Sequence, residues 1–378
     1  MALEAVSEYG MGTLGRELSV QLAHRALRRL ESDPVAAFLW ATAEYDLEEA
    51  VKALRVLLGD IAIWGGTVRR VWNQDGAPAR GMNLVVLGGE DLRIQSARFA
   101  QLPSVSEITE RLPHWQESVL FVALEAMQPR LNRWLDVLSH NQGGLNGGLV
   151  GGGLRVGRPA LIGGRDVGEG GMSLLTVQGT HLGLGWGSGW RSTGLWSQVT
   201  ESRGEWVRAL DGRPASQELE RLFGQPARRW AYAPLREFTR LYPLGLRTED
   251  GGWDIRAPLH VEADGSLRMT LPVPRGARAY WMVGSMDDAA QAAEDAAAYA
   301  LRALGKHSPA LALVWMDWAC SYLFTAHEDA IFQRVRRILG NDVPITGVYT
   351  YGQIVAPPQD TPARLLHNHI VVALLAAA

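Results

Sequence analysis

Cysteine is almost absent from this sequence, which has a single one, Cys320, in 378 residues. One thiol cannot form a disulfide within the chain, and scarce cysteine is typical of proteins kept in a reducing compartment. The first residues also lack the basic start and the apolar stretch of a secretory signal. We therefore expect a cytoplasmic protein.

Long hydrophobic runs and strong charge of one sign are missing as well. The longest apolar runs, VLFVALEAM and IVVALLAAA, reach about half of the roughly 20 residues that a membrane helix needs. The formal net charge is -3, so the chain has no large basic field that would attract nucleic acid. We expect neither membrane insertion nor a nucleic-acid partner.

The motifs of common cofactor sites are absent too. The sequence contains no GxxxxGK[ST] phosphate loop, no GxGxxG between a strand and a helix, no HExxH and no pair of cysteines. We expect no cofactor and no metal. A haem needs only one axial histidine, which spacing does not exclude, so a haem-binding sensor stays open as an alternative.

Strand and helix patterns alternate along the first half of the chain. Apolar residues recur at helical spacing over residues 14–30 and 46–58, and the second helix has Asp46 as its predicted N-cap and Gly59 as its predicted end. Short apolar runs then predict strands over residues 35–43, 61–68, 82–89 and 92–99. This order is typical of an α/β fold.

Glycine shapes the prediction for the middle of the chain. We predict helices over residues 115–127 and 129–139, then a long surface loop over residues 142–173, where glycine is dense. The alternative for this loop is a backbone that wraps closely around a ligand. The following stretch, HLGLGWGSGW, alternates in the manner of strands and predicts close backbone contact. Four tryptophans lie in apolar patterns and are predicted to be core residues: Trp40, Trp64, Trp134 and Trp315.

The second half repeats the element order of the first. A strand ending in ALALVWMDW, a helix in HEDAIFQRVRRILGND and strands in VPITGVYTYG and HIVVALL follow in the same order. We match Gly66 with Gly352 and Asn83 with Asn368, and infer an internal duplication. The predicted fold is α/β with two related lobes, each a mixed β-sheet flanked by helices, over residues 1–211 and 212–378.

The end of the chain carries a family resemblance. GVYTYGQI at 347–354, followed by Asn368 before a final apolar strand, is similar to the C-terminal signature of FIST sensory proteins, and LYPLGLR, HVEADGSLRMTLPVPRGARAYWM and LIGG before GSGWRSTG resemble further parts of that family. The resemblance assigns a FIST N-like domain to residues 1–211 and a FIST C-like domain to residues 212–378. It implies a signal-transduction input module that binds a small ligand such as an amino acid, passes the signal to a partner protein and is not an enzyme.

Four positions depart from the family pattern. Asp317 and Cys320 stand where the family commonly has a Cys-x-x-Arg motif, Gln353 replaces a glutamate and Ile370 replaces a threonine. A carboxylate, a guanidinium and a hydroxyl that would hold a ligand are therefore altered. The resemblance does not carry a ligand identity over to this chain.

The candidate site is built around the GVYTYGQI strand. Alternate side chains of a strand share a face, so Tyr349 and Tyr351 form either two walls of a pocket or a structural aromatic pair, and Gly352 turns the backbone. Asp317 ends an apolar strand and needs a partner, either a ligand or an arginine from the N-terminal half. We expect the site at this strand end or at the seam between the lobes. The candidate ligand contacts are Tyr349, Tyr351, Gly352, Gln353, Asn368, Asp317, Cys320, Gly65 and Gly66.

Two other functions stay open. A thiol-dependent enzyme would use Cys320 as its nucleophile, and His327 is the nearest histidine in the sequence that could serve as its base. A protein-interaction scaffold would need an apolar surface patch and no ligand pocket.

Overall fold

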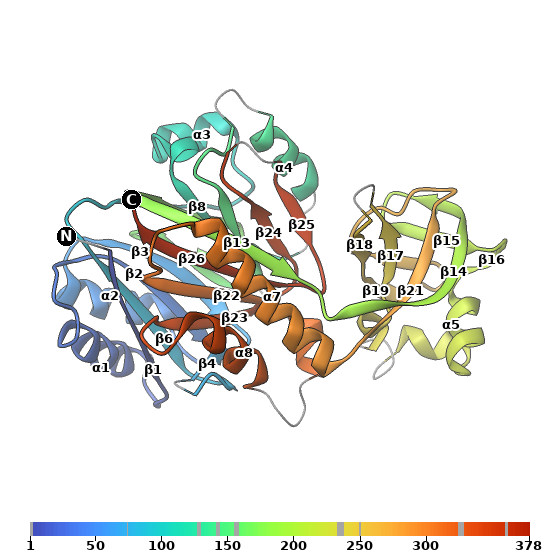
Figure 1. Ribbon diagram of the computed structural model, residues 1–378, viewed down its shortest axis with the longest axis horizontal. Coiled ribbons are helices and arrows are strands. Elements are labelled where there is room, and N and C mark those ends of the chain that lie inside the picture. The colour runs from blue at the N-terminus through green and yellow to red at the C-terminus, as the bar shows by residue number, and fades with distance from the viewer. Residues whose placement is uncertain are drawn as a thin grey trace. The chain divides into compact units, whose positions relative to one another are not determined.

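The computed structural model describes residues 3–73, 75–126, 130–140, 144–154, 159–232, 238–248, 251–323, 329–359 and 362–378. The chain forms two compact units (Figure 1). The first unit comprises Met1–Gly187, Ala290–Trp318 and Phe324–Ala378, and the second comprises Ser188–Ala289 and Ala319–Leu323. The units do not follow sequence order, and the division into residues 1–211 and 212–378 stays a prediction.

The first unit contains three six-stranded sheets. The first sheet runs β1 (Glu4–Gly10), β6 (Met82–Gly88), β2 (Pro34–Thr42), β3 (Ala62–Val68), β10 (Ala160–Gly164) and β11 (Asp166–Glu169). The second runs β25 (Arg364–Leu366), β24 (Gln353–Ala356), β9 (Leu149–Leu154), β8 (Val119–Glu125), β12 (Met172–Gln178) and β7 (Arg93–Phe99). The third runs β13 (Thr180–Gly187), β26 (Ile370–Ala377), β22 (Leu311–Asp317), β23 (Ile345–Thr350), β4 (Val71–Trp72) and β5 (Pro78–Ala79).

Helices flank these sheets. They are α1 (Gly15–Leu27), α2 (Leu47–Leu58), α3 (Val105–Arg111), α4 (Leu131–Ser139), α8 (Ala330–Leu339) and most of α7 (Met286–Leu304). The predicted cap of α2 is confirmed, because the Asp46 carboxylate accepts the backbone N–H groups of Glu48 and Glu49. Gly59 ends this helix at φ +74°, as predicted. Among the described helices, none is both long and apolar enough to cross a membrane.

Two of the sheets share one topology. β1 pairs antiparallel with β6, β6 antiparallel with β2, and β2 parallel with β3. β13, β26, β22 and β23 pair in the same order and with the same directions. α2 connects β2 to β3, and α8 connects β22 to β23. The predicted duplication of element order and the predicted α/β fold with two related lobes are therefore confirmed.

The residue matches predicted between the lobes are wrong in detail. Gly66 lies inside β3, opposite Trp40 of β2, whereas Gly352 lies in the turn after β23. Asn83 lies inside β6, also opposite Trp40, whereas Asn368 precedes β26. Glycine and asparagine occur both in turns and in strands, so a shared glycine or asparagine does not fix which residues of two elements correspond. The order of the elements can therefore be matched while the residue-by-residue register is wrong.

Each lobe also contributes a hairpin to another sheet. β4 and β5 follow β3 in the first lobe, yet Val71 of β4 pairs with Val348 of β23 in the second. β24 and β25 follow β23, yet β24 pairs with β9. This exchange brings the residues after β3 beside the end of β23.

Aromatic side chains from all three sheets meet in the core of the first unit. Ring centroids are 5.0 Å apart for Trp40 and Trp64, 5.7 Å for Trp64 and Phe121, and 6.2 Å for Phe121 and Trp315. Trp40, Trp64 and Trp315 are at most 2% exposed, and Trp134 is 8% exposed. The prediction that these four tryptophans are core residues is confirmed.

The glycine-rich segment is not a long loop, and this prediction is wrong. Most of its described residues form β9, β10, β11 and the start of β12. A β-carbon on Gly151 would stand 1.9 Å from the carbonyl oxygen of Val122 in β8, and one on Gly152 would stand 2.8 Å from that of Gly352. The glycines allow β9 to lie close to its neighbours, which is a strand use of glycine.

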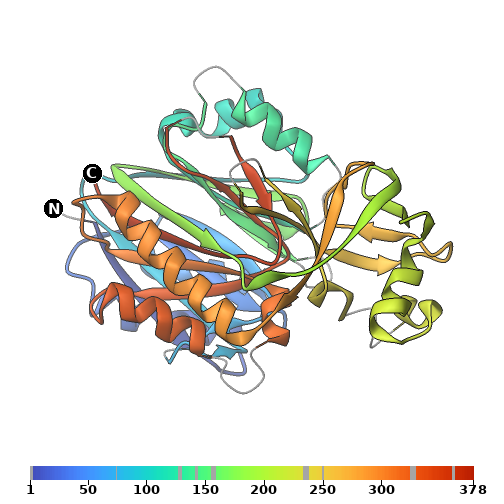
Figure 2. The ribbon, with the colours of Figure 1, turned by 45° about the vertical axis from the view of Figure 1, so that its right-hand side comes forward.

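Close backbone contact is confirmed for β13. Figure 2 shows α7 and α8 side by side over the sheet that contains β22 and β26, and Arg334 of α8 pairs with Glu294 of α7 at 2.7 Å. β-carbons on three alternate glycines of β13 would stand 2.3, 2.1 and 2.7 Å from carbonyl oxygens one turn apart on α7. The glycines are Gly183, Gly185 and Gly187, and the carbonyls belong to Ala300, Ala296 and Ala292.

The helix predicted over residues 115–127 is wrong. A short 3-10 helix, η1 (Trp115–Glu117), precedes the strand β8. β8 is buried on both faces, so its sequence VLFVALE shows no alternation. A continuous apolar run of this length fits a buried strand as well as a buried helix.

Most of the second unit is an insertion that follows β13 and ends in the first turn of α7. Its sheet runs β18 (Trp253–Arg256), β17 (Leu244–Arg247), β21 (Arg278–Gly284), β14 (Trp190–Arg203), β15 (Trp206–Leu210), β20 (Leu267–Met269) and β19 (Pro258–Val261), and β16 (Arg213–Pro214) pairs with β15. Its described helices are α5 (Ala215–Phe223), η2 (Ala227–Ala231), η3 (Thr239–Leu241) and most of η4 (Trp318–Tyr322). Leu219 of α5 joins the core of this unit.

Candidate functional site

The candidate site lies at the carboxyl ends of the parallel strands β22 and β23. Asp317 is the last residue of β22 and pairs with Thr350, the last residue of β23. Ligands of open α/β sheets commonly bind just beyond such strand ends, where side chains and loops converge. The fold therefore places the predicted strand-end residues where a binding site is expected.

Asp317 is the centre of a buried polar group. Its side chain is fully buried, and its Oδ2 accepts the backbone N–H of Gly352 at 3.2 Å and the amide of Gln353 at 3.5 Å. The Gln353 amide also donates to Thr350 Oγ1 at 2.9 Å, and the backbone N–H of Asp317 donates to the His369 carbonyl at 2.9 Å. The prediction that this acid needs partners is confirmed.

Gly352 makes the geometry of this group possible. Its φ of +89° lies in the region that favours glycine, as the predicted turn requires. A β-carbon at this position would also stand 2.7 Å from the His367 ring. The turn directs the Gly352 N–H at the Asp317 carboxylate.

Gln353 has one polar atom without a partner. The residue is fully buried, and its Oε1 has no hydrogen-bond partner among the described residues. A buried acceptor left unpaired costs about 1 to 3 kcal/mol. Such an atom is expected to be satisfied by a water molecule or by a ligand.

An aromatic and cationic layer adjoins the buried group. Tyr349 and Tyr351 both contact Trp318, with ring centroids at 5.4 and 6.3 Å, so they share a face of the strand as predicted. The Arg69 guanidinium lies 4.1 Å from the centre of the Trp318 ring and donates to the Tyr351 hydroxyl at 3.1 Å. Arg69 is exposed and Tyr351 is half-buried, so this layer reaches solvent.

Sequence reasoning missed Arg69 and Trp318. Arg69 directly follows β3 of the first lobe, and only the pairing of β4 with β23 brings it to the second lobe. The sequence feature that could have indicated Arg69 is the pair Arg69 and Arg70 at the carboxyl end of β3, which is parallel to the buried strand β2. Trp318 directly follows Asp317, which was already a candidate.

The other predicted residues lie in different settings. Asn368 is fully buried and has φ +58° in the turn before β26. Gly65 and Gly66 lie in the middle of β3, where β-carbons would stand 2.0 Å from the Leu39 carbonyl oxygen and 2.7 Å from that of Ala160. Close packing of β3 explains both glycines, and ligand contacts at these three positions stay predictions.

Cys320 is fully buried in η4 and belongs to the second unit. His327, its proposed base, lies outside the described residues. Within the part of the chain that the structure describes, no three histidine, cysteine, aspartate or glutamate side chains gather as a metal site requires. A thiol-dependent enzyme stays an alternative, and the absence of a cofactor stays a prediction.

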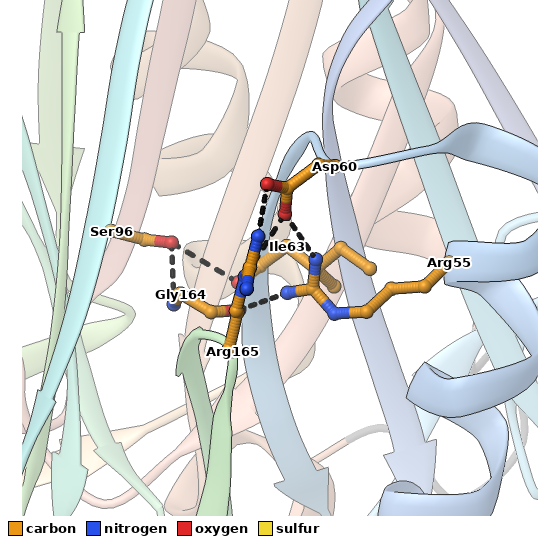
Figure 3. Close-up of polar contacts among 6 residues, drawn as sticks. All are labelled: Arg55, Asp60, Ile63, Ser96, Gly164 and Arg165. Atoms are coloured by element: carbon orange, nitrogen blue, oxygen red, sulfur yellow. Dashed lines mark hydrogen bonds and ion pairs between the residues drawn. The ribbon is translucent and has the colours of Figure 1, made fainter.

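A second polar cluster joins α2 to β10 (Figure 3). Asp60 forms ion pairs with Arg165 and Arg55, and Arg55 also donates to the Gly164 carbonyl. The Gly164 N–H donates to Ser96 at 2.7 Å. The cluster borders a hollow of about 580 Å³. Because Arg55 of α2 bonds both Asp60, which precedes β3, and the Gly164 carbonyl of β10, we assign this cluster to holding β10 against β3.

Asp60→Asn should remove an acid-sensitive part of the stability. The Arg165 hydrogen bond lowers the pKa of Asp60 below the value of about 3.9 expected in the unfolded chain. This contribution is therefore present above about pH 4 and is lost as the pH falls through the lower folded pKa. The effect should be small because the pair is exposed. Thermal unfolding from about pH 6 to about pH 2 should show the difference in Tm shrinking, and a constant difference would contradict the assignment.

Comparison with known proteins finds two family matches. Residues 35–213 match the FIST N domain and residues 215–356 match the FIST C domain. No curated protein matches the chain. A solved structure described as "Structure of PurLQS from Thermotoga maritima" aligns with 10% identity and a TM-score of 0.25 over 100% of this chain and 72% of that one. That similarity is too low to support an argument about the fold.

Proposed function

Because this chain belongs to the FIST family, whose domains are associated with sensory and signal transduction, we propose that it is a cytoplasmic sensor of a small ligand. The proposed ligand is an amino acid or a similar small metabolite, and the output passes to a partner protein. The proposal includes no catalytic step, cofactor, nucleic-acid partner or membrane insertion.

The unpaired Gln353 Oε1 beside the buried Asp317 carboxylate is the observation that carries this proposal. A ligand with a donor group would satisfy the Gln353 oxygen, and an ammonium group would be attracted by the Asp317 charge. Arg69 supplies the opposite charge in the adjoining aromatic layer. A negative and a positive side chain in one cluster match the two charges of an amino-acid zwitterion.

The aromatic layer supports the same ligand class. Trp318 and Tyr351 are stacked with an interplanar angle of 13°, and Arg69 lies over the Trp318 ring. A stacked guanidinium keeps N–H groups in its plane that can bind a carboxylate at two points. We propose that Arg69 binds the ligand carboxylate and that Asp317 and Gln353 bind its ammonium group.

A thermal-shift screen of the purified chain against the common amino acids tests the proposal. A ligand at a hundred times its Kd should add about 2.7 kcal/mol to the free energy of unfolding, which raises the Tm by several degrees. Arg69→Gln should weaken binding of the hit at least tenfold, since about 1.4 kcal/mol of charge interaction is lost. Arg80→Gln is the matched control, because Arg80 is exposed in the same unit and only its backbone carbonyl has a described bond, to Tyr9.

The screen also defines failure. If none of the amino acids in the panel stabilises the chain, the proposed ligand class is wrong. If Arg69→Gln binds the hit as tightly as the wild type, the role assigned to Arg69 is wrong. A hit weakened equally by Arg69→Gln and Arg80→Gln would place the ligand elsewhere.

A further inference from the structure

The second unit has a row of aromatic rings on one face of its sheet. Trp196 of β14 pairs directly with Tyr280 of β21, and the Tyr280 ring centroid lies 5.2 Å from that of Trp253 in β18. Arg278 and Arg247 lie over the two end rings, 4.6 Å from Trp196 and 4.0 Å from Trp253. These five side chains form a surface that we call the aromatic row.

The aromatic row lies on the face opposite the core of this unit. Ala279 and Trp281 alternate with Arg278 and Tyr280 along β21 and belong to the core. Trp196 is 44% exposed. Aromatic rings grouped on an outer face are a frequent mark of a binding surface, because they contribute large contact areas at low entropic cost.

A glycine shapes the middle of the row. Gly245 of β17 pairs with Tyr280 and lies between the strands that carry Tyr280 and Trp253. A β-carbon on Gly245 would stand 3.0 Å from the Trp253 ring and 2.2 Å from the Met282 sulfur. The absent side chain lets Trp253 lie across β17 and close the row.

The two arginines of the row have no described carboxylate partner. Neighbouring arginines differ in this respect, since Arg191 pairs with Asp288 at 3.2 Å and Arg256 pairs with Asp254. A guanidinium stacked on tryptophan is held in place and presents its in-plane donors to a carboxylate. The row therefore combines two oriented positive charges with an apolar centre.

We propose that the aromatic row docks an extended acidic segment of a partner protein. Trp196 and Trp253 lie on β14 and β18, whose backbones are three inter-strand spacings or about 14 Å apart. The end rings are closer than these strands, because the Trp253 ring lies 5.2 Å from the Tyr280 ring. An extended segment rises about 3.3 Å per residue and its alternate side chains share a face, so acidic side chains about two to four residues apart would reach both arginines. Apolar side chains between them would contact Tyr280. This proposal rests on the proposed function in one respect: the aromatic row would be the surface through which the sensor passes its signal to a partner protein.

The charges favour a protein partner over single-stranded nucleic acid. Nucleic-acid affinity grows with the number of phosphates neutralised, and the row offers only two arginines in a chain of net charge -3. A short acidic segment needs no more than these two positive charges.

A display library of random twelve-residue peptides, selected on the full chain without added ligand, tests the docking surface. We expect enriched peptides to carry aspartate or glutamate about two to four residues apart. Their affinity should fall at least tenfold for Arg247→Glu with Arg278→Glu, and also for Trp196→Ala, which leaves the charges intact. The matched control is Arg213→Glu with Arg228→Glu, which changes the charge of the same unit equally at exposed positions and should leave affinity unchanged.

Four outcomes would overturn the proposal. They are the absence of enriched acidic peptides, equal affinity for the wild type and both row variants, tighter row-dependent binding of a twelve-residue oligothymidylate, and self-association of the chain that Trp196→Ala abolishes. Because the selection uses no amino-acid ligand, its result is independent of the thermal-shift screen. Either proposal can therefore fail while the other holds.

Discussion

Gly65→Ala should lower the free energy of unfolding of the first unit by about 4 kcal/mol or more. Gly65 lies in β3 at φ +141°, and an added β-carbon would stand 2.0 Å from the carbonyl oxygen of Leu39. This oxygen belongs to the paired backbone of β2, which cannot move aside without disturbing the parallel register. Urea unfolding followed by circular dichroism should show a large fall in the midpoint, or no folded protein.

Gly59→Ala is the matched control. Gly59 also has a positive φ, of +74°, but an added β-carbon would meet no heavy atom within 4 Å. Its cost should be limited to the backbone strain, about 1 kcal/mol. Equal urea midpoints for the two variants would show that the close approach of β3 to Leu39 is not present in solution.

Local patterns in the sequence were sufficient for elements whose signals lie within a few residues. The α2 helix shows this, because Asp46 and Gly59 mark its two ends by hydrogen bonding and by backbone conformation. The order of β2, α2 and β3 could also be matched with β22, α8 and β23. Element order follows from local periodicity, and this is why the α/β fold was predictable.

Predictions failed where the role of a residue depends on a neighbour that is distant in the sequence. Gly151 has the same local appearance as a loop glycine, but its role depends on the Val122 carbonyl in another strand. The strand β8 was taken for a helix because burial on both faces removes the alternation that marks a strand. A stretch of a few residues shows neither which backbone will lie opposite a glycine nor whether both faces of a strand will be buried.

The candidate site was predictable on one side only. Asp317, Tyr349, Tyr351 and Gly352 lie within or next to two strands of one lobe, so strand-end reasoning grouped them. Arg69 comes from the other lobe, and the two arginines that follow β3 mark a strand end without indicating that β4 pairs with β23 and brings Arg69 to this site. The second unit was not predicted as an insertion for a related reason. It can be recognised only once β13, which precedes it, is known to pair with β26 at the end of the chain.

Asp317→Ala should cost about 3 kcal/mol of unfolding free energy, because the buried Gly352 N–H and the Gln353 amide would lose their shared acceptor. Asp317→Asn should cost less, about 1 kcal/mol, since an amide oxygen can still accept from Gly352. Urea unfolding measures both. The asparagine variant therefore removes the charge while keeping most of the fold.

This difference separates a structural role of Asp317 from a ligand-binding one. If Asp317 binds the ammonium group of an amino acid, Asp317→Asn should weaken binding at least tenfold while remaining folded. Thr42 is the matched control, because it ends β2 as Asp317 ends β22, and its hydroxyl accepts the Gly81 N–H at 2.9 Å. Thr42→Val should lose about 1 kcal/mol of stability and keep the ligand affinity. An asparagine variant that binds as tightly as the wild type would leave Asp317 a purely structural acid, and the sensor would then need another site.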